Sequence, residues 1–148
     1  IKGPTLEEFL ADGYPELDGL SAQHVRLQVI EDIAGMIKRF HVSGYFHKSL
    51  YCYHLIVAVH EHEQDKRWGQ PYFIDLESVV RGRNPHHRWF VQDLAALNLS
   101  APASVSLVDR WRFLKDYLPS YSREGRKQWA REIIAKTSKI AKSRPKYK

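Results

Sequence analysis

The chain of 148 residues has a single cysteine and no long apolar run. Cys52 alone cannot form an internal disulfide, which fits a reducing compartment such as the cytoplasm. No uninterrupted apolar stretch reaches the roughly 18 residues that a membrane span needs. The first twenty residues are acidic and polar and do not predict a secretory signal. The chain starts with Ile1 instead of methionine, which is consistent with a fragment or a processed product. A cytoplasmic location is therefore expected.

The composition predicts one globular domain. Hydrophobic residues make up 43% of the chain and aromatic residues 12%, which excludes a disordered class. A chain of this length buries one sizeable core.

Positive charge is concentrated at the C-terminal end. Of the net charge of +6, residues 121–148 carry ten Lys or Arg against two Glu, and the remaining 13 basic and 15 acidic side chains sum to about −2. Nucleic-acid binding favours a basic stripe on the folded body, so this distribution argues against it. Two interpretations stay open: a basic helix and tail on an anionic lipid surface, or a solvated helix face with a frayed tail.

Helical periodicity dominates the chain. Between residues 21 and 41 apolar side chains recur at Val25, Val29, Ile33 and Ile37, and Gly44 marks the end of the expected helix. Thr5 and Glu8 form a capping pattern for a short helix over 6–10. Further helices are expected over 89–99, 109–118 and 124–142.

Two short apolar runs predict a β-hairpin. Residues 55–59 and 71–75 are the expected strands, and the polar residues 60–69 are the expected loop. His60 and His62 lie in that loop without recognisable further metal ligands, which favours solvent exposure. A basic loop is expected over 79–87. The fold class predicted is α+β, mainly helical.

The segment after the long helix has the spacing of a kinase catalytic loop. Kinase loops read His-Arg-Asp, with Asn five residues after the Asp and a second Asp at the end of a hairpin strand. In this chain His47 stands at the His, Ser49 at the first Asp and His54 at the Asn. Asp75 stands at the second Asp.

Phosphoryl transfer requires a carboxylate near the acceptor hydroxyl and a metal that bridges the phosphates. The apolar residues before Asp75 predict a strand that delivers its carboxylate to a sheet end, as a Mg²⁺ ligand. His54 offers a nitrogen to a metal or an imidazole to a phosphate. His47 is expected to hydrogen-bond the backbone and hold the loop. An isolated Asp before a loop is usually a turn residue, but pairing with the upstream loop favours the metal ligand.

Three segments resemble the bacterial lipopolysaccharide core heptose kinases, a branch of the protein-kinase-like fold. Residues 47–57 read His-Lys-Ser-Leu-Tyr-Cys-Tyr-His-Leu-Ile-Val, similar to the family's His-Arg-Asp-Cys-Tyr-Ile-Cys-His-Phe-Leu-Leu. Residues 72–76 resemble its Tyr-Leu-Ile-Asp-Leu, and residues 88–97 its Arg-Trp-x-x-Lys-Asp-Leu-Ala-Ala-Leu. The helix from Asp109 also resembles the family's next helix.

The resemblance implies ATP-dependent phosphorylation of a sugar hydroxyl of the lipopolysaccharide inner core, at the cytoplasmic face of the inner membrane. It implies that Asp75, with His54, holds Mg²⁺ and that His54 contributes to the ATP-binding site. It also implies that Asp93 is the buried carboxylate that braces the catalytic loop. Residues 1–148 would be the kinase C-terminal lobe, with a helical core over 21–118 and a basic helix and tail over 121–148.

Two departures bear on activity. Ser49 occupies the position of the catalytic Asp, and a hydroxyl cannot replace a carboxylate base. The Gly-rich loop and the Lys and Glu of a kinase N-terminal lobe are absent from the sequence, so that lobe is an expected missing partner. An inactive pseudokinase that scaffolds a partner is therefore the alternative function.

Three arginines after Asp75 are candidate substrate contacts. Arg81, Arg83 and Arg88 could bind phosphates or acidic sugars through bidentate pairs, and a solvated basic loop is the equal alternative. A small basic nucleic-acid-binding protein is a third hypothesis, which predicts a steep salt dependence of affinity. No nucleic acid is expected as a partner.

Overall fold

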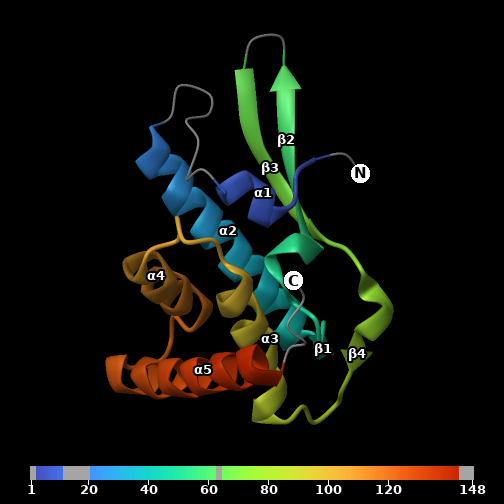
Figure 1. Ribbon diagram of the computed structural model, residues 1–148, viewed down its shortest axis with the longest axis vertical. Coiled ribbons are helices and arrows are strands. Elements are labelled where there is room, and N and C mark those ends of the chain that lie inside the picture. Colours follow the sequence, from blue (N-terminus) through green and yellow to red (C-terminus); the bar gives the residue numbers. More distant parts are fainter. Residues whose placement is uncertain (1–2, 12–20, 63–64, 144–148) are drawn as a thin grey trace.

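The computed structural model describes residues 3–11, 21–62 and 65–143. Its helices are α1 (Leu6–Leu10), α2 (Ala22–Val42), α3 (His87–Ser100), α4 (Leu107–Tyr117) and α5 (Arg123–Ser143). Its strands are β1 (Tyr45–Phe46), β2 (Leu55–His62), β3 (Asp65–Phe73) and β4 (Val80–Arg81), with 3₁₀ turns at Cys52–His54 and Leu76–Ser78. Figure 1 shows the β2–β3 hairpin projecting from a helical body, with α5 along the opposite side.

The long helix α2 forms the centre of the core. Ser21 caps it by accepting a hydrogen bond from the backbone N–H of His24, as expected for a Ser before the first helical residue. The apolar residues predicted from periodicity, among them Val25, Ile33 and Ile37, are buried. The short helix α1 begins with the predicted capping box of Thr5 and Glu8.

Gly44 ends the α2 segment in a conformation that favours glycine. Its φ is +89°, and a Cβ at this position would lie 2.9 Å from the carbonyl oxygen of Gly82. The N–H of Gly82 donates to the Gly44 carbonyl over 2.9 Å. This contact continues the antiparallel pairing of β1 with β4, a second two-stranded sheet that the sequence did not predict.

The hairpin is longer than predicted. β2 pairs antiparallel with β3 from Leu55 opposite Phe73 to His62 opposite Asp65, with an irregularity between Val57 and Val59. The expected loop over 60–69 was therefore wrong, since β2 covers residues 60–62 and β3 covers residues 65–69. A polar composition did not prevent pairing, because each strand satisfies the backbone groups of the other. The side chains of His60 and His62 lie outside the described part.

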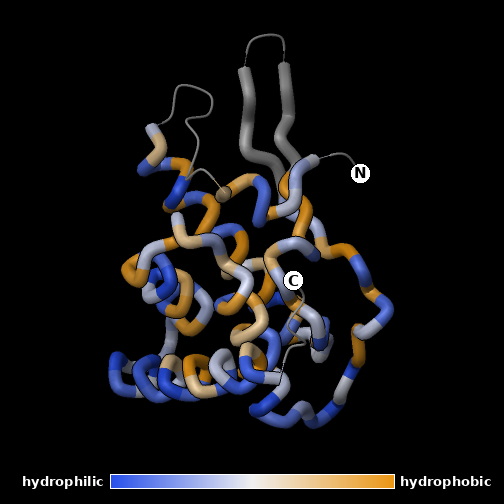
Figure 2. Tube along the Cα trace, viewed as in Figure 1, coloured by the Kyte–Doolittle hydropathy of each residue, from blue (hydrophilic) through white to orange (hydrophobic). Residues whose placement is uncertain are grey.

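The helices pack in pairs around one apolar core. α2 packs against α4, and α3 packs against α5. α5 buries Ile133 and Ile140 and exposes most of its charged residues, and Figure 2 shows hydrophilic and hydrophobic residues alternating along it. Within the described residues, no helix is long and apolar enough to cross a membrane.

Candidate functional site

The loop from His47 to His54 is held by a buried carboxylate on α3. Asp93 has no exposed surface. Its Oδ2 accepts from the backbone N–H of His47 over 2.9 Å, and its Oδ1 accepts from that of Lys48 over 2.9 Å. Hydrogen bonds to charged acceptors are among the stronger ones. Asp93 therefore fixes the backbone just before Ser49, which is the geometry that a bracing role requires.

Two further residues join this network, and the sequence analysis missed both. His41 Nε2 lies 2.8 Å from Asp93 Oδ2, and His41 Nδ1 lies 2.6 Å from the hydroxyl of Tyr117. Burial, and secondarily the charge of Asp93, raises the pKa of Tyr117 far above its usual value, so this hydroxyl keeps its proton. It donates to Nδ1, and Nε2–H donates to Asp93. The sequence did contain a signal for His41: it lies four residues after Ile37, on the apolar face of the expected helix, where a buried histidine needs a polar partner.

His47 and His54 have different tasks in the loop. His47 is fully buried, and its Nε2–H donates to the carbonyl of Ile74 over 2.8 Å. This bond ties the loop to the segment that carries Asp75. His54 Nδ1–H donates to the carbonyl of Ser49 over 2.6 Å, which leaves Nε2 directed toward Asp75.

His54 and Asp75 form a pair open to a ligand. His54 Nε2 lies 3.0 Å from Asp75 Oδ2, and the Asp75 side chain is 48% exposed. Both nitrogens of His54 face acceptor oxygens, so the ring forms both hydrogen bonds only when each nitrogen carries a proton. Metal-binding histidines commonly donate their other N–H to a backbone carbonyl, as His54 does here.

The backbone is strained at two positions around this pair. Lys48 and Asp75 have φ values of 69° and 55°, the only positive values among the described residues other than glycine. Such conformations cost about 1–3 kcal/mol each and often occur at active sites. Asp75 lies two residues beyond the end of β3, close to where the sequence predicted it.

The donor set fits Mg²⁺ that is held mainly by a substrate. No group of three or more His, Cys, Asp or Glu gathers in the described part of the chain. Mg²⁺ commonly binds one or two protein carboxylates and completes its octahedron with phosphate oxygens and water. Asp75 meets that requirement with an accessible carboxylate. The imidazole of His54 is a softer donor, so it fits better as the neighbour that orients Asp75 or contacts a phosphate.

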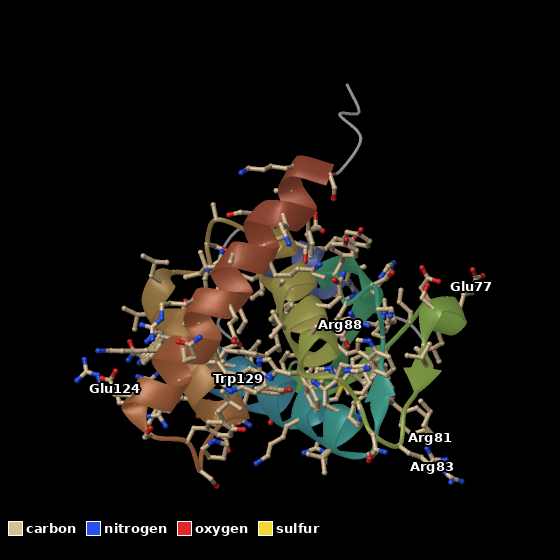
Figure 3. The ribbon with its side chains drawn as sticks, turned by 90° about the horizontal axis from the view of Figure 1, so that it is seen from below. Glu77, Arg81, Arg83, Arg88, Glu124 and Trp129 are labelled. Carbon is tan, nitrogen blue, oxygen red and sulfur yellow. The ribbon has the colours of Figure 1, made fainter. Side chains whose placement is uncertain are left out.

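The structure does not bring the three arginines together. Arg81 and Arg83 are exposed on one side of the molecule, and Arg88 lies apart from them on α3 (Figure 3). The guanidinium of Arg81 stands over the ring of Tyr45, 5.3 Å from its centroid. The solvated-loop interpretation therefore fits Arg81 and Arg83 better than a shared anion site.

Cys52 has no catalytic geometry. It is 1% exposed, and its Sγ–H points to the carbonyl of Leu97 over 3.8 Å. Burial raises the pKa of this thiol from 9.0 to about 11. We expect folded Cys52 to react with iodoacetamide at pH 8 at least ~100-fold more slowly than in denaturant, because a shift of two pKa units lowers the thiolate fraction about 100-fold. Mass spectrometry of the alkylated protein measures both rates, and similar rates would contradict a packed thiol.

A large apolar cavity lies away from this chemistry. It has a volume of about 730 Å³ and is lined mainly by apolar side chains of α1 to α5, such as Leu10, Ile33 and Leu97. Cys52 is the only residue of the His47–His54 loop that borders it. Its acidic lining residue Asp109 is paired with Arg26 over 3.2 Å. The candidate site is therefore the loop and Asp75.

Comparisons with known proteins show a family and a fold to which this chain is similar. The profile of the lipopolysaccharide kinase (Kdo/WaaP) family matches residues 5–117, a range that contains the loop, Asp75 and Asp93. No curated protein gives a match. The chain is similar to a solved structure described as WaaP in complex with acyl carrier protein, with a TM-score of 0.72 and 24% identity. The similarity covers 95% of this chain and 57% of that one. At this identity it shows the fold, and it confirms the predicted mainly helical, kinase-like class.

Proposed function

Because the chain belongs to the lipopolysaccharide kinase (Kdo/WaaP) family, we propose that it is the C-terminal lobe of an ATP-dependent phosphotransferase. Its acceptor is a sugar hydroxyl of the lipopolysaccharide inner core. The observation that supports this proposal is the Asp93-braced loop, in which His54 bonds the Ser49 carbonyl and lies beside Asp75. The enzyme works at the cytoplasmic face of the inner membrane, where the growing core is attached to lipid.

Each residue has a task in this proposal. Asp75 holds Mg²⁺, which supplies charge compensation for the transferred phosphoryl group. His54 orients Asp75 and lies next to the ATP phosphates. Position 49 faces the acceptor hydroxyl, and His47 and Asp93 keep the loop in place. Arg88 remains a candidate contact for an anionic group of the acceptor.

An N-terminal lobe completes the nucleotide site in this proposal. An open apolar groove of about 460 Å³ lies between α2 and the turn after Asp75. Its lining includes Met36, Phe40, Tyr45 and Phe73. Apolar grooves beside an active centre are typical contact surfaces for a second domain. We propose that the N-terminal lobe of the full-length protein covers it.

The test is a phosphotransfer assay with ATP, Mg²⁺ and dephosphorylated lipopolysaccharide. The full-length protein and its Ser49→Asp variant are compared with the present chain. Phosphate transfer to the sugar by the full-length Ser49→Asp variant supports the proposal, and its absence contradicts a kinase. A pseudokinase scaffold is the alternative that Ser49 favours. Activity that appears only in the Ser49→Asp variant assigns the unchanged protein to that alternative.

We also propose that α5 holds the protein near an anionic membrane surface. Arg131, Lys139 and Lys142 are exposed on this helix. Each basic residue near an anionic surface contributes about 1 kcal/mol. Changing all three to Gln is expected to lower the affinity for phosphatidylglycerol vesicles about 100-fold, as measured by cosedimentation. Arg39→Gln on α2 serves as the matched control, and equal binding of both variants would favour a merely solvated face.

A further inference from the structure

The outer side of the catalytic loop carries two tyrosines. The side chains of Leu50 and Cys52 are buried at 0% and 1% exposure. The backbone at Tyr51 is extended, with φ of −92° and ψ of 154°. Neighbouring side chains of an extended segment point to opposite sides. The burial of positions 50 and 52 therefore leaves Tyr51 on the outer side, and Tyr53, in the 3₁₀ turn that follows, is 36% exposed.

The two rings form one ordered surface, which we call the tyrosine pair. Their centroids lie 5.2 Å apart and their planes differ by 5°. Tyr53 is 36% exposed and Tyr51 is partly exposed. The ring of His54 stands edge-on to that of Tyr53, with 4.6 Å between centroids. The tyrosine pair thus borders the His54–Asp75 pair and lies two to four residues after position 49 in the same loop.

Backbone hydrogen bonds fix the tyrosine pair relative to the site. The N–H of Tyr51 donates to the carbonyl of Ser49, and the N–H of His54 donates to that of Tyr51, each over 2.9 Å. The N–H of Cys52 donates to the hydroxyl of Ser100 on α3 over 2.8 Å. A surface held in this way loses little conformational entropy when a ligand binds.

We propose that the tyrosine pair binds the ring of the acceptor sugar and directs its hydroxyl toward position 49. This inference rests on the proposed function and adds a binding residue, Tyr53, to it. The C–H groups on one face of a pyranose carry a small positive charge, and the faces of aromatic rings are negative. Aromatic side chains supply such contact area at low entropic cost.

The test measures sugar binding without ATP or Mg²⁺. The probe is the deacylated inner-core oligosaccharide, followed by saturation-transfer NMR and titration. We expect Tyr53→Ala to weaken binding about tenfold, because it removes the ring face that contacts the C–H groups of the sugar. Tyr53→Phe keeps the ring and should retain most of the affinity. Tyr121→Ala removes a tyrosine of similar exposure, 46%, before α5 and should bind like the unchanged chain.

The outcomes separate this inference from the proposed function. Three outcomes would contradict sugar binding by the tyrosine pair. These are an unchanged affinity of Tyr53→Ala, an equal loss of affinity in Tyr121→Ala, and no binding by the unchanged chain. If the full-length Ser49→Asp variant transfers phosphate and adding Tyr53→Ala leaves the KM for the sugar unchanged, the kinase proposal is supported and sugar binding by the tyrosine pair is contradicted. If Tyr53→Ala abolishes oligosaccharide binding but no variant transfers phosphate, sugar binding by the tyrosine pair is supported and the kinase proposal is contradicted.

Discussion

Replacing Ser49 by Asp in the full-length protein is expected to raise kcat for phosphotransfer by about 10²–10⁴-fold, the usual contribution of a general base. The Ser49 carbonyl accepts from His54 Nδ1 and from the N–H of Tyr51, so the backbone at this position is already fixed. Asp93 holds the preceding two residues. A new carboxylate would therefore extend from an ordered loop near the Asp75 side of the site.

The matched control is Ser49→Asn, which has the shape of Asp without its basicity. Initial rates at saturating ATP give kcat, and the KM for the sugar separates chemistry from binding. A gain in kcat with Asp but not with Asn is the expected result. Equal rates for all three residues at position 49 would show that this position does not act on the acceptor hydroxyl.

Asp93→Ala is expected to lower the free energy of unfolding by about 3–5 kcal/mol, the range for breaking a buried charged network. Three donors lose their acceptor at once: the backbone N–H groups of His47 and Lys48, and His41 Nε2. For a chain of this size the loss corresponds to a fall in Tm of about 10 °C. Thermal unfolding followed by circular dichroism measures it.

Two further variants test whether the lost hydrogen bonds cause this destabilisation. Asp93→Asn keeps one acceptor oxygen and should destabilise the protein less than Asp93→Ala. Glu31→Ala changes an exposed acid on α2 and should stay within about 0.5 kcal/mol of the unchanged chain. A Tm of Asp93→Ala close to that of Glu31→Ala would contradict the bracing role.

Much of the fold was readable from the sequence. The periodicity of Val25, Ile33 and Ile37 and the capping box at Thr5 predicted helices that the structure contains, with ends within a few residues. These signals are local, since a helix and its capping box depend on residues three or four positions apart; the cap at Ser21 became visible only in the structure. The β1–β4 pair was missed because two-residue strands carry no periodic signal and pair across distant parts of the chain.

The same distinction applies to the site. The sequence by itself determined which chemical groups are present: the order of His47, His54 and Asp75, and a serine at position 49. Only the tertiary structure decided how they are held. Asp93 meets His41 across 52 positions, and Tyr117 meets His41 across 76. Such contacts form only when α2, α3 and α4 pack around one core, because no local pattern specifies which buried polar groups will satisfy one another.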